Sequence, residues 1–202
     1  MPDPNPAPAG MVARPSGHGH QVNDRPWGAF VPDHLREGMA ELEEAYTRGD
    51  DDDHPLGGYL VLLACYGGLV AGLGGLVAWR RPEVPATPAP GDLALLAVAT
   101  HKLSRILTKD PVTSPLRAPF TRFERPTGKG EVAEQTRGAG LRHAIGELVT
   151  CPFCTAQWVA TVLSASLVVA PRLTRRVAGV FCLTAGSDLL QLAYAKALGS
   201  VD

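Results

Sequence analysis

Two cysteines, Cys151 and Cys154, flank a Pro-Phe pair just before a long apolar segment. Proline suits the first turn of a helix, because its missing N–H would be unpaired there. We therefore expect both thiols at a helix N-terminus, whose dipole stabilises a thiolate as nucleophile or metal ligand. Three interpretations stay open: thiol–disulfide exchange with Cys151 as nucleophile and Cys154 as resolving thiol, half of a metal site completed by His143, His101 or a second subunit, and structural packing.

Asp188 is a second residue that indicates chemistry, because it interrupts an apolar run over residues 177–195. An ionised carboxylate in an apolar helix costs free energy unless it is paired or hydrated. The basic groups inside another apolar segment are His101, Lys102 and Arg105. We predict an ion pair between Asp188 and this cluster. It would fix helix register or belong to a proton or ion path; alternatively, Asp188 lies near an interface and meets water.

These residues need helices to position them, and four segments have the required apolar character. Residues 56–79 contain no Asp, Glu, Lys or Arg, and a helix of that length crosses a hydrocarbon core of about 30 Å. The other segments are 151–171, 177–196 and the more polar 93–107, which either spans or lies in the interface; we favour the span. No stretch alternates as barrel strands do. The predicted fold is an all-α integral membrane bundle of three to four transmembrane helices, occupying residues 56–202.

Residues 1–55 form a separate, acidic segment. Over residues 1–56 there are 11 acidic and 4 basic side chains, against 9 and 15 over residues 57–202. The segment is rich in Pro, Ala and Gly and is predicted to be a disordered N-terminal tail with a short helix from Asp33 to Tyr46. No basic stripe is interleaved with aromatic residues, which excludes a nucleic-acid-binding protein. We expect no cofactor and no resident metal.

The polar loop over residues 108–150 separates the second and third apolar segments. Its prolines predict turns up to Pro126, and a helical pattern follows Glu131. Within that pattern His143 and Glu147 are paired at i, i+4. The opposite face is apolar and packs on the membrane surface or on the bundle, and it consists of Leu141, Ile145, Leu148 and Val149.

The distribution of Lys and Arg predicts the orientation in the membrane. Seven lie in the segment 107–150: Lys109, Arg117, Arg122, Arg125, Lys129, Arg137 and Arg142. Five lie on the opposite side: Arg80, Arg81, Arg172, Arg175 and Arg176. A multi-pass protein of the cell membrane is therefore expected, with the N-terminus and the loop 107–150 in the cytoplasm.

Several stretches resemble domain-of-unknown-function family 1360, a group of small bacterial membrane proteins of which some are labelled sporulation proteins. They are ATHKLSRILTKDPVTSPLRAPFTRFE, GEVAEQTRG, LRHAIGELVTCPFCTAQWVA and AGSDLLQLAYA, within about residues 92–195. The resemblance implies three or four membrane helices and carries no activity. It implies that the family's motif includes His101-Lys102, Lys109-Asp110-Pro111, Arg117-Ala118-Pro119-Phe120, Arg142-His143, the cysteine pair and Asp188.

Our first hypothesis is a non-enzymatic scaffold that binds a partner through the loop 107–150. That surface includes Lys109, Asp110, Arg117, Arg142, His143 and Glu147. The alternative is a membrane thiol–disulfide oxidoreductase that uses Cys151 and Cys154, and a transporter around Asp188 is a third hypothesis. The expected partners are the lipid bilayer and either a protein or a second copy of the chain.

Overall fold

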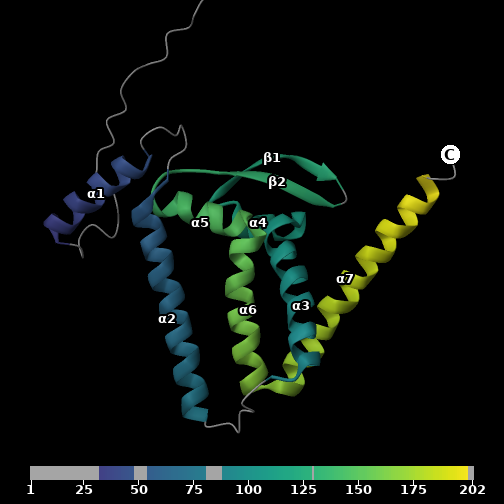
Figure 1. Cartoon of the computed structure of the whole chain (residues 1–202). Helices are drawn as coiled ribbons and strands as arrows, with labels where there is room; N and C mark the ends of the chain where they lie inside the picture. The colour runs from purple at the N-terminus through teal and green to yellow at the C-terminus, as the bar shows by residue number, and fades with distance from the viewer. Residues whose placement is uncertain (1–31, 48–53, 81–87, 129, 200–202) are drawn as a thin grey trace, which may run out of the picture.

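The structure, a computed structural model, describes residues 32–47, 54–80, 88–128 and 130–199, and most of these are helical (Figure 1). The elements in chain order are α1 (Asp33–Thr47), α2 (Leu56–Arg80), α3 (Pro90–Lys109), the 3-10 helix η1 (Pro111–Thr113), α4 (Ser114–Arg117), β1 (Thr121–Gly128), β2 (Glu131–Thr136), α5 (Leu141–Thr150), α6 (Pro152–Val169) and α7 (Pro171–Gly199). The predicted helix at Asp33 is confirmed as α1. The rest of the predicted disordered tail, 1–31 and 48–53, lies outside the described residues.

Four helices stand side by side and alternate in direction: α2 and α6 run one way, α3 and α7 the other (Figure 1). Of these, α2, α6 and α7 are long and apolar enough to cross a membrane by length and composition. The predicted all-α membrane bundle is thereby confirmed. The more polar α3 packs between α6 and α7, where its Leu96 and Ala99 share a buried cluster with Val159, Leu163 and Ala178.

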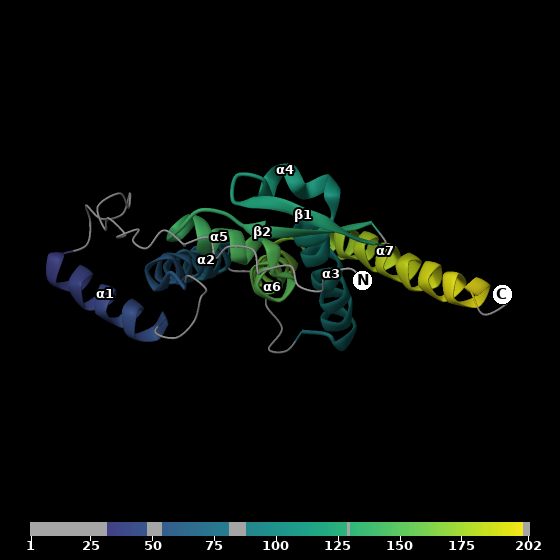
Figure 2. The ribbon, with the colours of Figure 1, turned by 90° about the horizontal axis from the view of Figure 1, so that it is seen from above.

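One end of the bundle is covered by a layer that we call the cap, residues 110–128 and 130–150. Its elements are η1, α4, the β1–β2 hairpin and α5, and they lie across the upright helices (Figures 1 and 2). Here the sequence prediction was wrong: the segment after Glu131 is a strand, and helix begins only at Leu141. The segment before it is also more than a series of turns, because residues 121–128 form the partner strand.

The hairpin depends on glycine at its tight turn. Gly128 pairs with Glu131, and Gly128 and Gly130 have φ angles of 82° and 80°. Glycine adopts such positive φ angles without a steric penalty, so these two positions favour glycine at the end of the hairpin. Pro126 lies in β1 because a strand with an unpaired side tolerates the loss of an N–H.

The cap approaches the bundle too closely for larger residues at two points. A Cβ on Gly58 of α2 would lie 2.8 Å from the Cβ of Ala144, and one on Gly146 of α5 would lie 2.8 Å from the carbonyl oxygen of Phe120. These glycines let α5 lie flat on α2 and on the segment that enters the hairpin. Ala144 and Gly146 are the buried residues of α5, and both lie at these close contacts.

The last helix, α7, packs on α3 through its first part and then leaves the bundle at an angle (Figures 1 and 2). Its second half exposes Leu189, Leu190 and Tyr194. An apolar helix that is exposed in this way suits a lipid environment.

Candidate functional site

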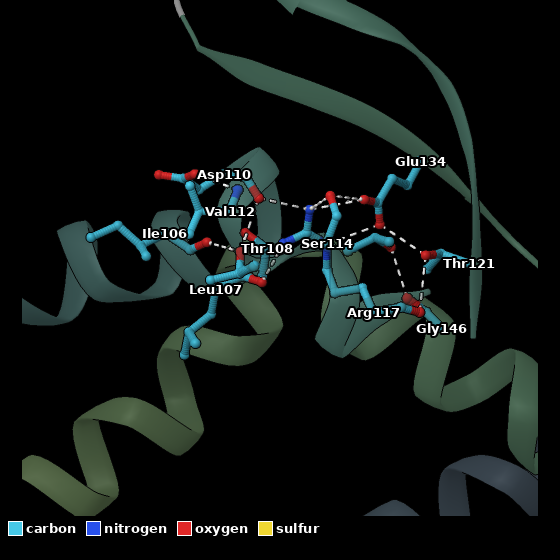
Figure 3. A network of polar contacts seen from close by, with 12 residues as sticks. Ile106, Leu107, Thr108, Asp110, Val112, Ser114, Arg117, Thr121, Glu134 and Gly146 are labelled. Atoms are coloured by element: carbon cyan, nitrogen blue, oxygen red, sulfur yellow. Dashed lines mark hydrogen bonds and ion pairs between the residues drawn. The ribbon is translucent and has the colours of Figure 1, made fainter. Parts of the chain in front are cut away.

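The centre of the cap is Arg117, the last residue of α4, whose side chain is only 1% exposed. Its Nε and Nη2 donate to the two carboxylate oxygens of Glu134 in β2, both at 2.9 Å (Figure 3). Such a bidentate pair combines charge with a fixed planar geometry. Arg117 therefore ties β2 to α4.

The same guanidinium also ties the cap to the end of α3. Its Nη1 donates to the carbonyl oxygen of Leu107 at 2.8 Å, and its Nη2 donates to that of Asp110 at 3.0 Å (Figure 3). The hydroxyls of Thr113 and Ser114 accept further bonds from Nη1 and Nη2, at 2.6 and 3.0 Å. All three guanidinium nitrogens are thus used inside the protein, and Arg117 positions the cap instead of offering donors to a ligand.

Glu134 is the matching buried acid, with a side chain 5% exposed. Its carboxylate accepts hydrogen bonds at 2.8 Å from both Ser114 and Thr121, in addition to those from Arg117. Burial raises the pKa of Glu134, but the hydrogen bonds from Arg117, Ser114 and Thr121 and the arginine's charge outweigh it, so the pKa lies below its ordinary value. The carboxylate is therefore held in its charged form.

Asp110 has a local task in this arrangement. Its Oδ1 accepts from the N–H of Val112 at 2.9 Å and so caps η1, while its own N–H bonds back to Ile106. This turn ends α3 and directs the chain into α4. Lys109, its predicted neighbour in the motif, is the last residue of α3.

The basic residues predicted to surround Asp188 contact two different acidic residues. Lys102 of α3 contacts Asp188 of α7 in an ion pair. Arg105 instead contacts Glu131, with its Nε 3.0 Å from Oε1 and its Nη2 2.7 Å from Oε2. His101 is on an exposed side of α3. The structure thus brings Lys102 to Asp188 and directs Arg105 towards the hairpin.

A second α3–α7 pair lies near the other end of these helices. Arg175 Nε and Nη2 donate to the two oxygens of Asp92 at 2.7 and 2.8 Å. From the sequence, Arg175 was expected only as a cation flanking a span, and its pairing with Asp92 was not predicted. The two residues lie in the first turns of helices that run in the same direction, so the starts of α3 and α7 meet (Figure 1). They are 83 positions apart in the sequence, so no local pattern indicated the pair.

The other predicted cap residues connect α5 to its surroundings. Glu147 accepts a hydrogen bond from the Tyr59 hydroxyl of α2 at 2.6 Å, and His143 Nε2 lies 3.6 Å from Glu147 Oε1. Arg142 Nε donates to the carbonyl oxygen of Pro119 at 2.9 Å. These contacts hold α5 between α2 and the start of the hairpin.

The cysteine pair lies at the corner between α5 and α6. Cys151 is the N-cap of α6, and its sulfur accepts from the N–H of Cys154 at 3.2 Å. Both thiols are free and Cys154 is exposed. Cys65 and Cys182 lie apart from them, in α2 and α7. Across the described part of the chain, no three His, Cys, Asp or Glu side chains are grouped as metal ligands.

Comparisons with known proteins match the part of the chain that contains this site. A family model described as a protein of unknown function, DUF1360, matches residues 95–194. The sporulation protein YjcA of Bacillus subtilis (strain 168) is 34% identical over 83 residues, which cover 40% of this chain and 70% of that protein. No solved structure matches the chain. The matched residues run from α3 through the cap to α7.

Proposed function

This chain belongs to the DUF1360 family, and we propose that it is a membrane-embedded platform whose cap binds a protein partner. One observation carries this proposal. The cap is anchored by the buried pair of Arg117 and Glu134, yet it exposes large apolar side chains that do not belong to the long apolar helices. Val112 is 86% exposed, Leu116 69% and Phe123 65%.

Exposed apolar groups on a rigid support are typical of protein-binding surfaces, because burying them stabilises a complex at little cost in conformational entropy. Phe123 lies between Arg122 and Glu124 on β1, and Arg125 follows, with a side chain 68% exposed. Aromatic and arginine side chains are enriched in the residues that dominate binding energy. The expected partner is a protein with an apolar patch bordered by acidic groups.

The proposed orientation places the cap in the cytoplasm. Support comes from the excess of Lys and Arg in residues 107–150. The directions of α2, α3, α6 and α7 alternate (Figure 1). With α3 as a fourth span, the start of α2 and the end of α7 are on the side of the cap. The relative's name refers to sporulation, so a sporulation-linked protein is the first partner to test.

A photo-crosslinking amino acid at Phe123 or Leu116 tests the proposal in living cells. We expect adducts of discrete mass from both positions. The matched control is Val180 of α7, which is also exposed and apolar but lies in a membrane helix. Cap positions that give no adducts, or the same adducts as Val180, would contradict the proposed function.

A further inference from the structure

A half-open groove of about 280 Å³ lies between α2, α6 and α7. Its walls are almost wholly apolar and include Leu73 and Leu76 of α2, Leu163 and Val169 of α6, and Leu173 and Val177 of α7. These residues lie towards the ends where α2 and α6 finish and α7 begins, which Figure 1 shows at the end of the bundle opposite the cap. The groove therefore belongs to a different face from the proposed partner surface.

The ends of the groove-lining helices carry exposed arginines. Arg80 follows Leu76 by four residues and so lies on the same face of α2. Arg172 is the neighbour of Leu173, and Arg176 comes one helical turn later. Trp79, next to Arg80, is exposed, and its ring centroid is 5.8 Å from the Arg80 guanidinium carbon. Tryptophan and arginine together are typical of the level of lipid headgroups.

We propose that this groove binds one acyl chain of an anionic phospholipid, with the lipid phosphate at Arg80 and Arg172. The groove is slightly smaller than the roughly 300–1,000 Å³ of sites for drug-sized ligands, which suits a slender chain. Arginine forks match phosphate oxygens, so exposed arginines at this end of the helices suit an anionic headgroup.

Native mass spectrometry of the full chain in neutral detergent tests this proposal. The probes are dioleoyl phosphatidylglycerol and dioleoyl phosphatidylcholine in equal amounts, which share acyl chains and differ in headgroup charge. We expect the wild-type chain to retain one phosphatidylglycerol in preference to phosphatidylcholine. Ala165→Phe places a ring in the groove and should abolish retention of that lipid, because Ala165 lines the groove.

The charge of the groove mouth is tested by the double variant Arg80→Gln and Arg172→Gln. We expect it to retain a lipid but to lose the preference for phosphatidylglycerol by roughly an order of magnitude. Two controls should behave as the wild type: Ala71→Phe, at an exposed position of α2, and the double variant Arg122→Gln and Arg125→Gln, which removes the same charge from the cap.

Several results would overturn the proposal. Equal retention of the two lipids by the wild-type chain would make the binding non-selective, and displacement by inorganic phosphate would make it a headgroup site without an acyl chain. Undiminished retention in Ala165→Phe, or a dimer that this variant dissociates, would also contradict it. If Ala165→Phe fails to fold, the arginine variant decides, because its changes lie at exposed helix ends.

Discussion

Arg117 and Glu134 form the part of the cap that tolerates change least. Both side chains are almost completely buried, and they satisfy each other and the polar groups around them. Removing one partner of such a pair leaves a buried charge uncompensated, whereas a well-packed apolar pair can be as stable as the ion pair. The pair thus makes the position of the hairpin depend on two specific residues.

We predict that Arg117→Ala lowers the free energy of unfolding of the cap by about 3–5 kcal/mol. Limited proteolysis within residues 120–137 of the detergent-solubilised chain measures this loss as faster cleavage. Arg125→Ala is the control, because its side chain is 68% exposed and its contact with Glu124 is 3.4 Å. Exposed pairs contribute about 1 kcal/mol or less. Equal cleavage of the two variants would contradict the prediction.

The low pKa of Glu134 predicts how the cap responds to acid. The pKa of Glu134 is lower in the folded chain than in the unfolded chain, where it is about 4.3. The charged carboxylate therefore stabilises the fold fully above that pH, and this stabilisation is lost as the pH falls through the pKa of the folded chain. Proteolysis of the cap should accelerate only below about pH 4.3. The cap of the Glu134→Gln variant should be cleaved faster than the wild-type cap at pH 7, and its cleavage rate should depend less on pH. A wild-type cap that opens near pH 6 would be inconsistent with this mechanism.

Cys151 has a structural task as the N-cap of α6. We predict that Cys151→Ala lowers the free energy of unfolding by about 1 kcal/mol, whereas Cys151→Ser retains the cap, because a serine hydroxyl is a preferred N-cap acceptor. Thermal unfolding of both variants in the same detergent measures the difference. Equal loss in the two would mean that the sulfur does not stabilise the chain as an N-cap acceptor.

At the scale of elements, α3 and α7 are held together by an ion pair towards each end of their contact, Lys102 with Asp188 and Arg175 with Asp92. Between them Cys182 Sγ lies 3.4 Å from the carbonyl oxygen of Leu95. Two separated ionic contacts define both the register and the crossing of the helices, which apolar packing alone leaves less specific.

We predict that Asp188→Asn loosens this helix pair and that the exchange Lys102→Asp with Asp188→Lys restores it. The measurement is oxidative cross-linking of Leu95→Cys to the natural Cys182, with the other cysteines replaced. Asp188→Asn should reduce the yield, and the exchanged pair should recover it. Unchanged cross-linking and abundance in Asp188→Asn would show that the pair does not fix register.

The long helices could be predicted from sequence because membrane spans are marked by local composition, and residues 56–79 illustrate this clearly. Asp188 could be matched with Lys102 because an acid in an apolar run needs a partner. The hairpin could not be found in this way. Its strands are short, charged and interrupted by Pro126, and they are held by Arg117 and Glu134, a nonlocal contact with no periodic signal. Gly128 and Gly130, on either side of Lys129, were the available clue.

At the scale of the whole molecule, four alternating helices place the cap on the same side as the start of α2 and the end of α7 (Figure 1). If α3 lay in the interface, the cap would be on the opposite side from the start of α2. Measuring which of these positions are accessible from outside the cell therefore distinguishes a chain with three spans from one with four. It also distinguishes the two orientations of the chain in the membrane.

We predict that Val112→Cys, in a cysteine-free chain, reacts with a membrane-impermeant maleimide only after lysis, whereas Arg172→Cys reacts in intact cells. Val112 is 86% exposed, and Arg172 is an exposed residue at the opposite end of the bundle. A tag before α2 should be protected together with Val112→Cys. The reverse labelling of all three positions would indicate the opposite orientation, and a tag on the side of Arg172 would indicate three spans.

The Arg117 cluster has a consequence for the order in which the chain matures. Every group that the guanidinium contacts lies between Leu107 and Glu134. A ribosome has therefore synthesised the complete set before it reaches α6 and α7, and contacts so close in sequence form quickly. The Arg117 cluster therefore needs no residue of α6 or α7, and we expect it to form without them.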